Sequence, residues 1–130
     1  MLLFGHRFIK SEKFYHINDI DAILKTPPNS TIYIEFDEDN LDIIEYLQNN
    51  DITFALEIKN ITQAVYAEAL HAKYIILSKE MAKTIQKIAE TYLFDAKIIA
   101  HITDEKEIDE LAIEGIDGVV FPSAFIKVTT

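Results

Sequence analysis

Residues 72–123 read AKYIILSKEMAKTIQKIAETYLFDAKIIAHITDEKEIDELAIEGIDGVVFPS, and this stretch decides the fold. Three short apolar runs are typical of buried strands, at residues 73–78, 97–103 and 118–123. The two segments between them, residues 79–94 and 104–116, have the spacing of amphipathic helices. Strands that alternate with helices of this length predict a parallel sheet covered by helices. In such sheets, ligands bind at the carboxyl ends of the strands.

The same alternation extends toward the N-terminus. Strands are expected at residues 31–37 (TIYIEFD) and 52–58 (ITFALEI), and helices at residues 18–25, 40–48 and 60–71. In the last helix, we expect Ile61, Ala64, Val65 and Leu70 to face inward. Residues 1–9 and 14–17 are both β-prone, and either could form the first core strand. The sequence predicts one α/β domain over residues 1–130, a three-layer sandwich with a mostly parallel sheet. A partial (β/α) barrel is the alternative, and it would leave open sheet edges.

Composition narrows the classes of function. The chain has 130 residues, of which 49% are hydrophobic, and a formal net charge of −10. This charge disfavours nucleic acid, because neutralising phosphates needs clustered Lys and Arg. There is no cysteine, which excludes disulfides and thiolate chemistry and fits a reducing cytoplasm. No apolar run is long enough for a membrane span, and no signal-peptide pattern is present, so we expect a cytoplasmic protein.

From residue 32 to about residue 122, the order of these segments resembles the N-terminal, Rossmann-like domain of regulators of potassium conductance (RCK, or TrkA-N, domains). The motifs that carry the resemblance are IYIEFDED at residues 32–39, AKYIIL at 72–77, IIAHI at 98–102 and IDGVVFP at 116–122. The resemblance implies a Rossmann-like fold, pairing into homodimers, a partner in potassium transport, and a nucleotide near Asp37 and Asp39. These acids stand where the family has its ribose-binding acid.

The glycine-rich turn that binds a dinucleotide is missing. Such a turn needs three glycines, so that the backbone can approach the pyrophosphate. Gly5 is the only glycine before Gly115, and Arg7 and Lys10 stand where the second and third glycines would be. Their side chains would occupy the space of the pyrophosphate. We therefore expect no tightly bound cofactor and, at most, a weakly held nucleotide that depends on Asp37.

A second resemblance points to an enzyme. His-Arg, Glu-x-Asp and Glu-x-Lys positions like those of glycerophosphodiester phosphodiesterases occur at three expected strand ends: His6 and Arg7, Glu35 and Asp37, Glu57 and Lys59. The resemblance implies a divalent metal on the carboxylates and acid–base chemistry by His6. The competing interpretation is that Arg7 and Lys59 only neutralise exposed carboxylates at strand ends, with no metal bound.

The remaining histidines, His16, His71 and His101, are interpreted as structural, because no two of them have the i, i+4 spacing of a zinc pair. The C-terminal segment suggests a dimer. Its apolar residues, Phe121, Phe125, Ile126 and Val128, follow the last expected strand, where a short domain has little left to cover them. The favoured interpretation is a non-catalytic regulatory or interaction module. The alternative is a metal-dependent, phosphodiesterase-like enzyme that uses His6, Glu35, Asp37 and Glu57.

Overall fold

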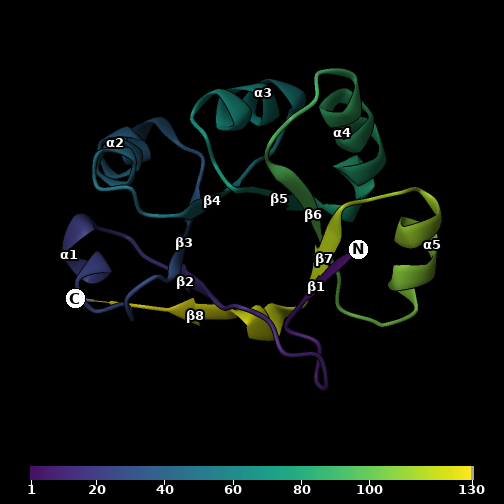
Figure 1. Ribbon diagram of the computed structural model, residues 1–130, viewed down its shortest axis with the longest axis horizontal. Coiled ribbons are helices and arrows are strands. Elements are labelled where there is room, and N and C mark those ends of the chain that lie inside the picture. Colours follow the sequence, from purple (N-terminus) through teal and green to yellow (C-terminus); the bar gives the residue numbers. More distant parts are fainter. Residues whose placement is uncertain (130) are drawn as a thin grey trace.

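The computed structural model describes residues 1–129, and this part of the chain forms an α/β fold around one parallel sheet (Figure 1). The sheet has eight strands in the described residues: β1 (Leu2–Phe4), β2 (Phe14–His16), β3 (Thr31–Glu35), β4 (Phe54–Glu57), β5 (Tyr74–Ser78), β6 (Lys97–His101), β7 (Gly118–Val120) and β8 (Phe125–Lys127). Every neighbouring pair is parallel. The α/β class and the parallel sheet expected from the sequence are confirmed, and they are consistent with a Rossmann-like fold.

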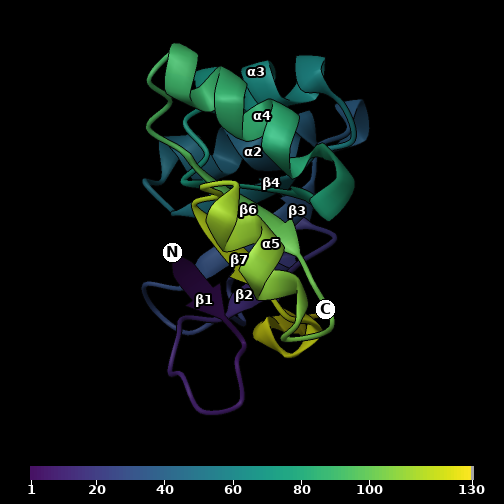
Figure 2. The ribbon, with the colours of Figure 1, turned by 90° about the vertical axis from the view of Figure 1, so that its right-hand side faces the viewer.

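The strand order follows the sequence across most of the sheet. It runs β1-β7-β6-β5-β4-β3-β2-β8, so β2 to β7 are arranged consecutively, with β1 and β8 added at the edges. This order lacks the reversal at which doubly wound sheets bind dinucleotides. The sheet curls, and the helices lie around its outer, convex side (Figures 1 and 2). Both N-terminal segments form strands: β1 pairs with β7, whereas β2 lies between β3 and β8.

The helices are shorter than the sequence pattern suggests. They are α1 (Ile20–Ile23), α2 (Leu41–Asn49), α3 (Ile61–Ala69), α4 (Lys79–Thr91) and α5 (Glu107–Ile113), with short 3-10 turns η1 (Glu38–Asn40) and η2 (Pro122–Ala124). The side chain of Asn60 caps α3 by accepting a hydrogen bond from Gln63 N at 2.8 Å. In α4, the helix ends before Leu93, which adopts a left-handed backbone with φ of 53°. Residues 92–94 therefore lie beyond the helix.

Two apolar layers stabilise the fold, one on each side of the sheet. The larger one lies between the sheet and the helices. The smaller one fills the concave side and includes Phe4, Phe14, Tyr33 and Tyr74. Six residues of the three apolar runs predicted to be buried strands have no exposed surface, and they are Ile75, Ile76, Ile98, Ile99, Val119 and Val120. The apolar strand pattern therefore identified the centre of the sheet correctly.

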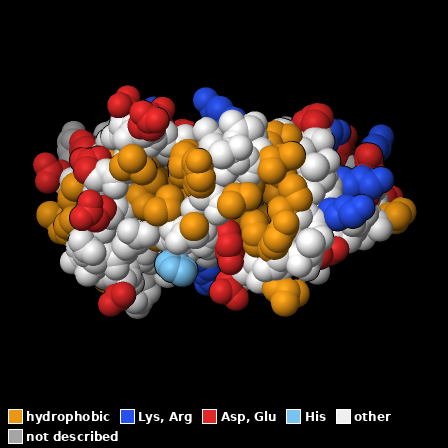
Figure 3. All heavy atoms as spheres, turned by 90° about the horizontal axis from the view of Figure 1, so that it is seen from above, with side chains coloured by type: hydrophobic (Ala, Val, Ile, Leu, Met, Phe, Trp, Pro, Cys, Tyr) orange, Lys and Arg blue, Asp and Glu red, His pale blue; other side chains and the backbone are white. Residues whose placement is uncertain are grey.

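The prediction for α3 is wrong at two positions. Ile61 and Val65 are each 46% exposed, whereas Ala64 and Ala67 are fully buried. The helix thus packs on the sheet through its alanines, whose small side chains allow a close approach, and its branched residues face outward. Hydrophobic side chains consequently reach the surface of the helical side of the molecule (Figure 3).

The C-terminal segment folds back onto its own chain. Phe125, in β8, pairs in register with Phe14 of β2, and Val128 N donates to His16 O at 2.9 Å. The ring of Phe125 packs against Tyr33 at a centroid distance of 4.7 Å. The expectation that the apolar residues of this segment are exposed together is therefore wrong: Phe121, Phe125 and Val128 are partly buried against the core, and only Ile126 is exposed, at 38%. The homodimer stays a prediction, without this support.

Candidate functional site

Polar side chains gather where β2, β3, β4 and β6 end. Glu35 and Glu57 are the last residues of β3 and β4 and are directly paired in register. Side chains paired in this way point to the same face of the sheet, roughly 5 Å apart. His16 and His101 are the last residues of β2 and β6. The carboxyl end of the parallel sheet, where α/β proteins bind their ligands, therefore carries two carboxylates and two imidazoles.

His16 and Glu35 form the first couple. His16 Nε2 lies 3.0 Å from Glu35 Oε1 and 3.2 Å from Glu35 Oε2. The imidazole ring also packs edge-on against the ring of Tyr33, at a centroid distance of 4.9 Å. Both side chains of the couple are partly exposed. The carboxylate fixes the orientation of the imidazole, and both groups remain reachable from solvent.

Glu57 and His101 form the second couple, which shares a buried tyrosine. Glu57 Oε1 lies 2.6 Å from His101 Nε2 and accepts a hydrogen bond from Tyr33 Oη at 2.8 Å. Burial raises the pKa of Tyr33 well above its usual value, and the nearby charges of Glu57 and Glu35 add to this effect. Tyr33 therefore remains a hydroxyl donor at every physiological pH. It holds Glu57 in place for His101.

Phe125 joins the two couples into one cluster. Its ring lies 4.7 Å from the ring of Tyr33 and 5.6 Å from the ring of His101, measured between centroids. We use "strand-end cluster" for His16, Tyr33, Glu35, Glu57, His101 and Phe125. The cluster draws on five strands, β2, β3, β4, β6 and β8, so it exists only when the sheet is complete.

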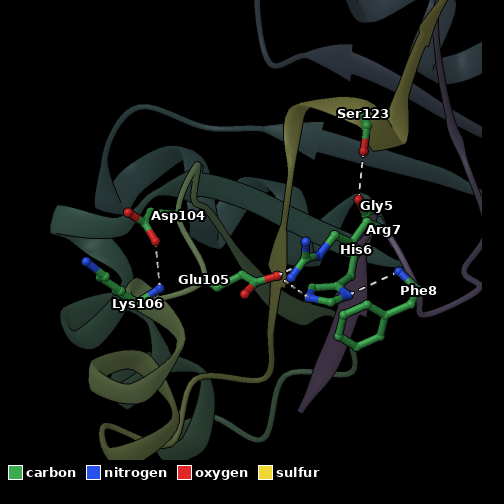
Figure 4. Close-up of polar contacts among 8 residues, drawn as sticks. All are labelled: Gly5, His6, Arg7, Phe8, Asp104, Glu105, Lys106 and Ser123. Atoms are coloured by element: carbon green, nitrogen blue, oxygen red, sulfur yellow. Dashed lines mark hydrogen bonds and ion pairs between the residues drawn. The ribbon is translucent and has the colours of Figure 1, made fainter.

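The structure brings together only two of the four residues predicted for a phosphodiesterase-like site. Glu35 and Glu57 are neighbours. Asp37 is exposed and caps η1, where it accepts a hydrogen bond from Asp39 N at 2.9 Å. His6 instead binds Glu105, with His6 Nε2 lying 3.0 Å from Glu105 Oε1 (Figure 4). The two acids proposed for a nucleotide, Asp37 and Asp39, are thus both exposed in one short turn.

Arg7 behaves as the simpler interpretation predicts. Arg7 Nε lies 3.2 Å from Glu105 Oε1, so this exposed arginine neutralises a carboxylate. Lys59 differs, because its backbone N–H donates to Gln63 Oε1 at 2.8 Å and its side chain forms no ion pair with the described residues. Figure 4 shows His6 and Arg7 directed at the same carboxylate from one side.

A hollow of about 580 Å³ lies beside this contact, at the carboxyl ends of β1, β6 and β7. Its wall includes His6, Glu105 and Ser123. Gly5 has φ of 78°, and a Cβ atom there would lie 2.9 Å from Ala124 N. Ser123 Oγ donates to Gly5 O at 2.7 Å. Glycine at position 5 thus allows η2 to pack closely against the backbone. Residues 5–13 contain no helix, so they lack the helix N-terminus that follows a dinucleotide-binding turn.

Within residues 1–129, no group of three or more His, Asp or Glu side chains is arranged to hold a metal ion. None of the helices in this part of the chain combines the length and the apolar character that a membrane crossing requires. No family model and no curated protein matches the chain.

Sequence reasoning missed the histidines of the site. His16 and His101 were interpreted as structural because neither lies in a metal-binding spacing. The available signal was positional: each lies near the carboxyl end of a β-prone segment, as do Glu35 and Glu57, and in the structure all four are the last residues of their strands. Tyr33 and Phe125 had no such signal, because an aromatic residue in a strand is typical of any core.

Proposed function

We propose that the strand-end cluster is an acid–base site that hydrolyses phosphodiesters. The observation that carries this proposal is the presence of two separate histidine–glutamate couples on one sheet edge, His16 with Glu35 and His101 with Glu57. A carboxylate that binds one nitrogen of an imidazole orients the ring and stabilises its protonated form. Each couple can therefore accept or give one proton.

Two such couples match the needs of phosphodiester hydrolysis. One imidazole takes a proton from the attacking water, whose oxygen forms the new bond to phosphorus. The other imidazole, in its protonated form, gives a proton to the leaving oxygen as the old P–O bond breaks. The products are a phosphomonoester and an alcohol, and a second proton transfer restores the starting states. Both histidines are bound to glutamate through Nε2, so Nδ1 of each ring is the nitrogen left for substrate or water.

The substrate class follows from the resemblance to glycerophosphodiester phosphodiesterases at residues 6–7, 35–37 and 57–59. The curled sheet with consecutive strands also supports it, because such sheets place catalytic groups at the carboxyl ends of several strands. The roles differ from those that the resemblance implies. Glu35 and Glu57 bind histidines, so we propose that they orient acid–base groups and that no metal ion is required.

Hydrolysis of bis(p-nitrophenyl) phosphate tests the proposal. The wild-type protein should release p-nitrophenol in the presence of a chelator, and His16→Gln and His101→Gln should each lower kcat by about 100-fold or more. His71→Gln is the matched control, since His71 is exposed and lies outside the cluster. Activity that appears only with added Mg²⁺ would favour the metal-dependent version. If the wild-type protein is no faster than a variant that carries both His16→Gln and His101→Gln, the metal-free and the metal-dependent versions of the proposal are both overturned.

A second candidate function is a regulatory or interaction module of the RCK type, linked to potassium transport and acting as a homodimer. The observation that favours it is the outward face of α3, where Ile61, Val65 and Tyr66 are exposed on one helix. Apolar side chains gathered on a surface often mark an interface. Light scattering distinguishes the cases: a dimer that becomes a monomer on Val65→Asp supports association through α3. A wild-type monomer removes this support.

A further inference from the structure

β8 places a lysine beside the first couple. In the parallel pair of β2 and β8, Phe14 is in register with Phe125, and His16 is in register with Lys127. Phe14 and Phe125 both face the concave side, where their rings lie 5.6 Å apart between centroids. Side chains two residues further along each strand point to the same side. Lys127 therefore begins on the face of the sheet that carries His16.

The charge of Lys127 has no partner among residues 1–129. Lys127 is exposed, and its ammonium group forms no ion pair with the described residues. Arg7 and Lys79, by contrast, have partners, since Arg7 binds Glu105 and Lys79 binds Glu107 at 2.7 Å. Lys59, beyond the end of β4, also lacks an ion pair within the described residues, but it is not in register with a residue of the strand-end cluster. A lysine beside His16 without an ion pair in the described residues is a cationic group that can bind an anion.

We infer that Lys127 is the specificity-determining contact for the anionic phosphate group of the substrate, which it holds beside His16. This inference rests on the proposed function and names the part of the site that recognises charge. Phe125 lies two residues before Lys127 on β8 and is partly exposed. Its ring provides the apolar wall against which the rest of the substrate packs. β8 thus acts as the recognition element, while β2, β3, β4 and β6 supply the proton-transfer groups.

The hollow at His6 and Arg7 is a weaker candidate for this anion. Glu105 already neutralises Arg7 and binds His6, so an incoming phosphate would meet a carboxylate. Figure 4 shows the Glu105 carboxylate facing both of these side chains. Lys127, unlike Arg7, forms no ion pair with a carboxylate of the described residues.

Kinetics with a charged and a neutral substrate test the inference. Lys127→Gln should raise KM for bis(p-nitrophenyl) phosphate by about 10-fold with little change in kcat, because a hydrogen bond to a charged group is lost. Hydrolysis of p-nitrophenyl acetate, which is neutral, should be unchanged. Lys127→Arg should restore the phosphodiester KM. Lys97→Gln is the matched control, because Lys97 is an exposed lysine at the opposite end of a strand.

Binding of inorganic phosphate provides a readout independent of turnover. Phosphate should shift the NMR resonances of His16 in the wild-type protein, and Lys127→Gln should weaken this binding about 10-fold, at constant ionic strength. A wild-type protein that binds phosphate through Lys127 but cleaves nothing would overturn the proposed function and leave this inference standing. Active enzyme in which Lys127→Gln changes neither KM nor phosphate affinity would overturn the inference alone. Circular dichroism confirms that each variant is folded.

Discussion

His101 Nε2 lies 2.6 Å from Glu57 Oε1, although the two residues are 44 positions apart in sequence and their strands are separated by β5. The contact spans a neighbouring strand because the sheet curls and brings the ends of β4 and β6 toward one another on its concave side. A flat sheet would hold strands two places apart at roughly 10 Å. The curvature of the sheet therefore favours the contact within the second couple of the strand-end cluster.

Tyr33→Phe removes one hydroxyl and keeps the ring that packs against Phe125 and His16. We expect a loss of about 1–3 kcal/mol in the free energy of unfolding, because Glu57 loses a hydrogen bond to a charged group in a partly buried place. Urea denaturation measures this loss. Tyr92→Phe, on an exposed tyrosine, is the control and should change stability by less than about 0.5 kcal/mol. Equal effects of the two substitutions would show that Tyr33 does not support Glu57.

Gly5→Ala should destabilise the fold more than Gly115→Ala does. Both glycines have a positive φ, 78° and 77°, so alanine is strained at either position. Only at Gly5 would the new Cβ also meet backbone, 2.9 Å from Ala124 N, whereas no atom lies within 4 Å of a Cβ at Gly115. The difference between the two variants, about 1–3 kcal/mol, isolates the clash with η2. Indistinguishable unfolding curves would mean that η2 does not press on Gly5.

Acid should remove the contribution of the contact between Lys79 and Glu107. The hydrogen bond from Lys79, followed by those from the backbone N–H groups of Thr103 and Asp104, lowers the pKa of Glu107 to about 2 from 4.5. Because the folded pKa lies below the unfolded one, the stabilisation is complete above about pH 4.5 and disappears as the pH falls toward 2. Unfolding of Glu107→Gln should therefore depend less on pH than wild-type unfolding in this window. Parallel pH profiles would contradict the assignment.

The strands were predictable because buried parallel strands are apolar on both faces. Residues 73–78 and 97–103 correspond to β5 and β6, and their isoleucines are fully buried. The order of strands was not predictable, since each β–α unit has the same local pattern whether the chain later reverses or continues around a curl. The outward face of α3 was also missed. The spacing of apolar residues in α3 allows either Ile61 and Val65 or Ala64 and Ala67 to face the sheet. In the structure, Ala64 and Ala67 face it.

About half of the site could be inferred from the sequence. Glu35 and Glu57 were singled out because, at expected strand ends, they resemble the Glu-x-Asp and Glu-x-Lys positions of glycerophosphodiester phosphodiesterases. Their partners depend on curvature and register, which no local pattern encodes. The role of Phe125 depends on the pairing of β8 with β2. From the sequence, this segment was expected to be exposed to solvent.

The proton-transfer role of the strand-end cluster is tested most directly by kcat for bis(p-nitrophenyl) phosphate in the Glu57→Gln variant. The amide still accepts the hydrogen bond from Tyr33 but cannot stabilise a protonated His101 as a carboxylate does. We predict that kcat falls by about 100-fold or more while KM stays within about twofold. Glu45→Gln, on the exposed side of α2, is the control and should be fully active. An unchanged kcat in Glu57→Gln would contradict the account.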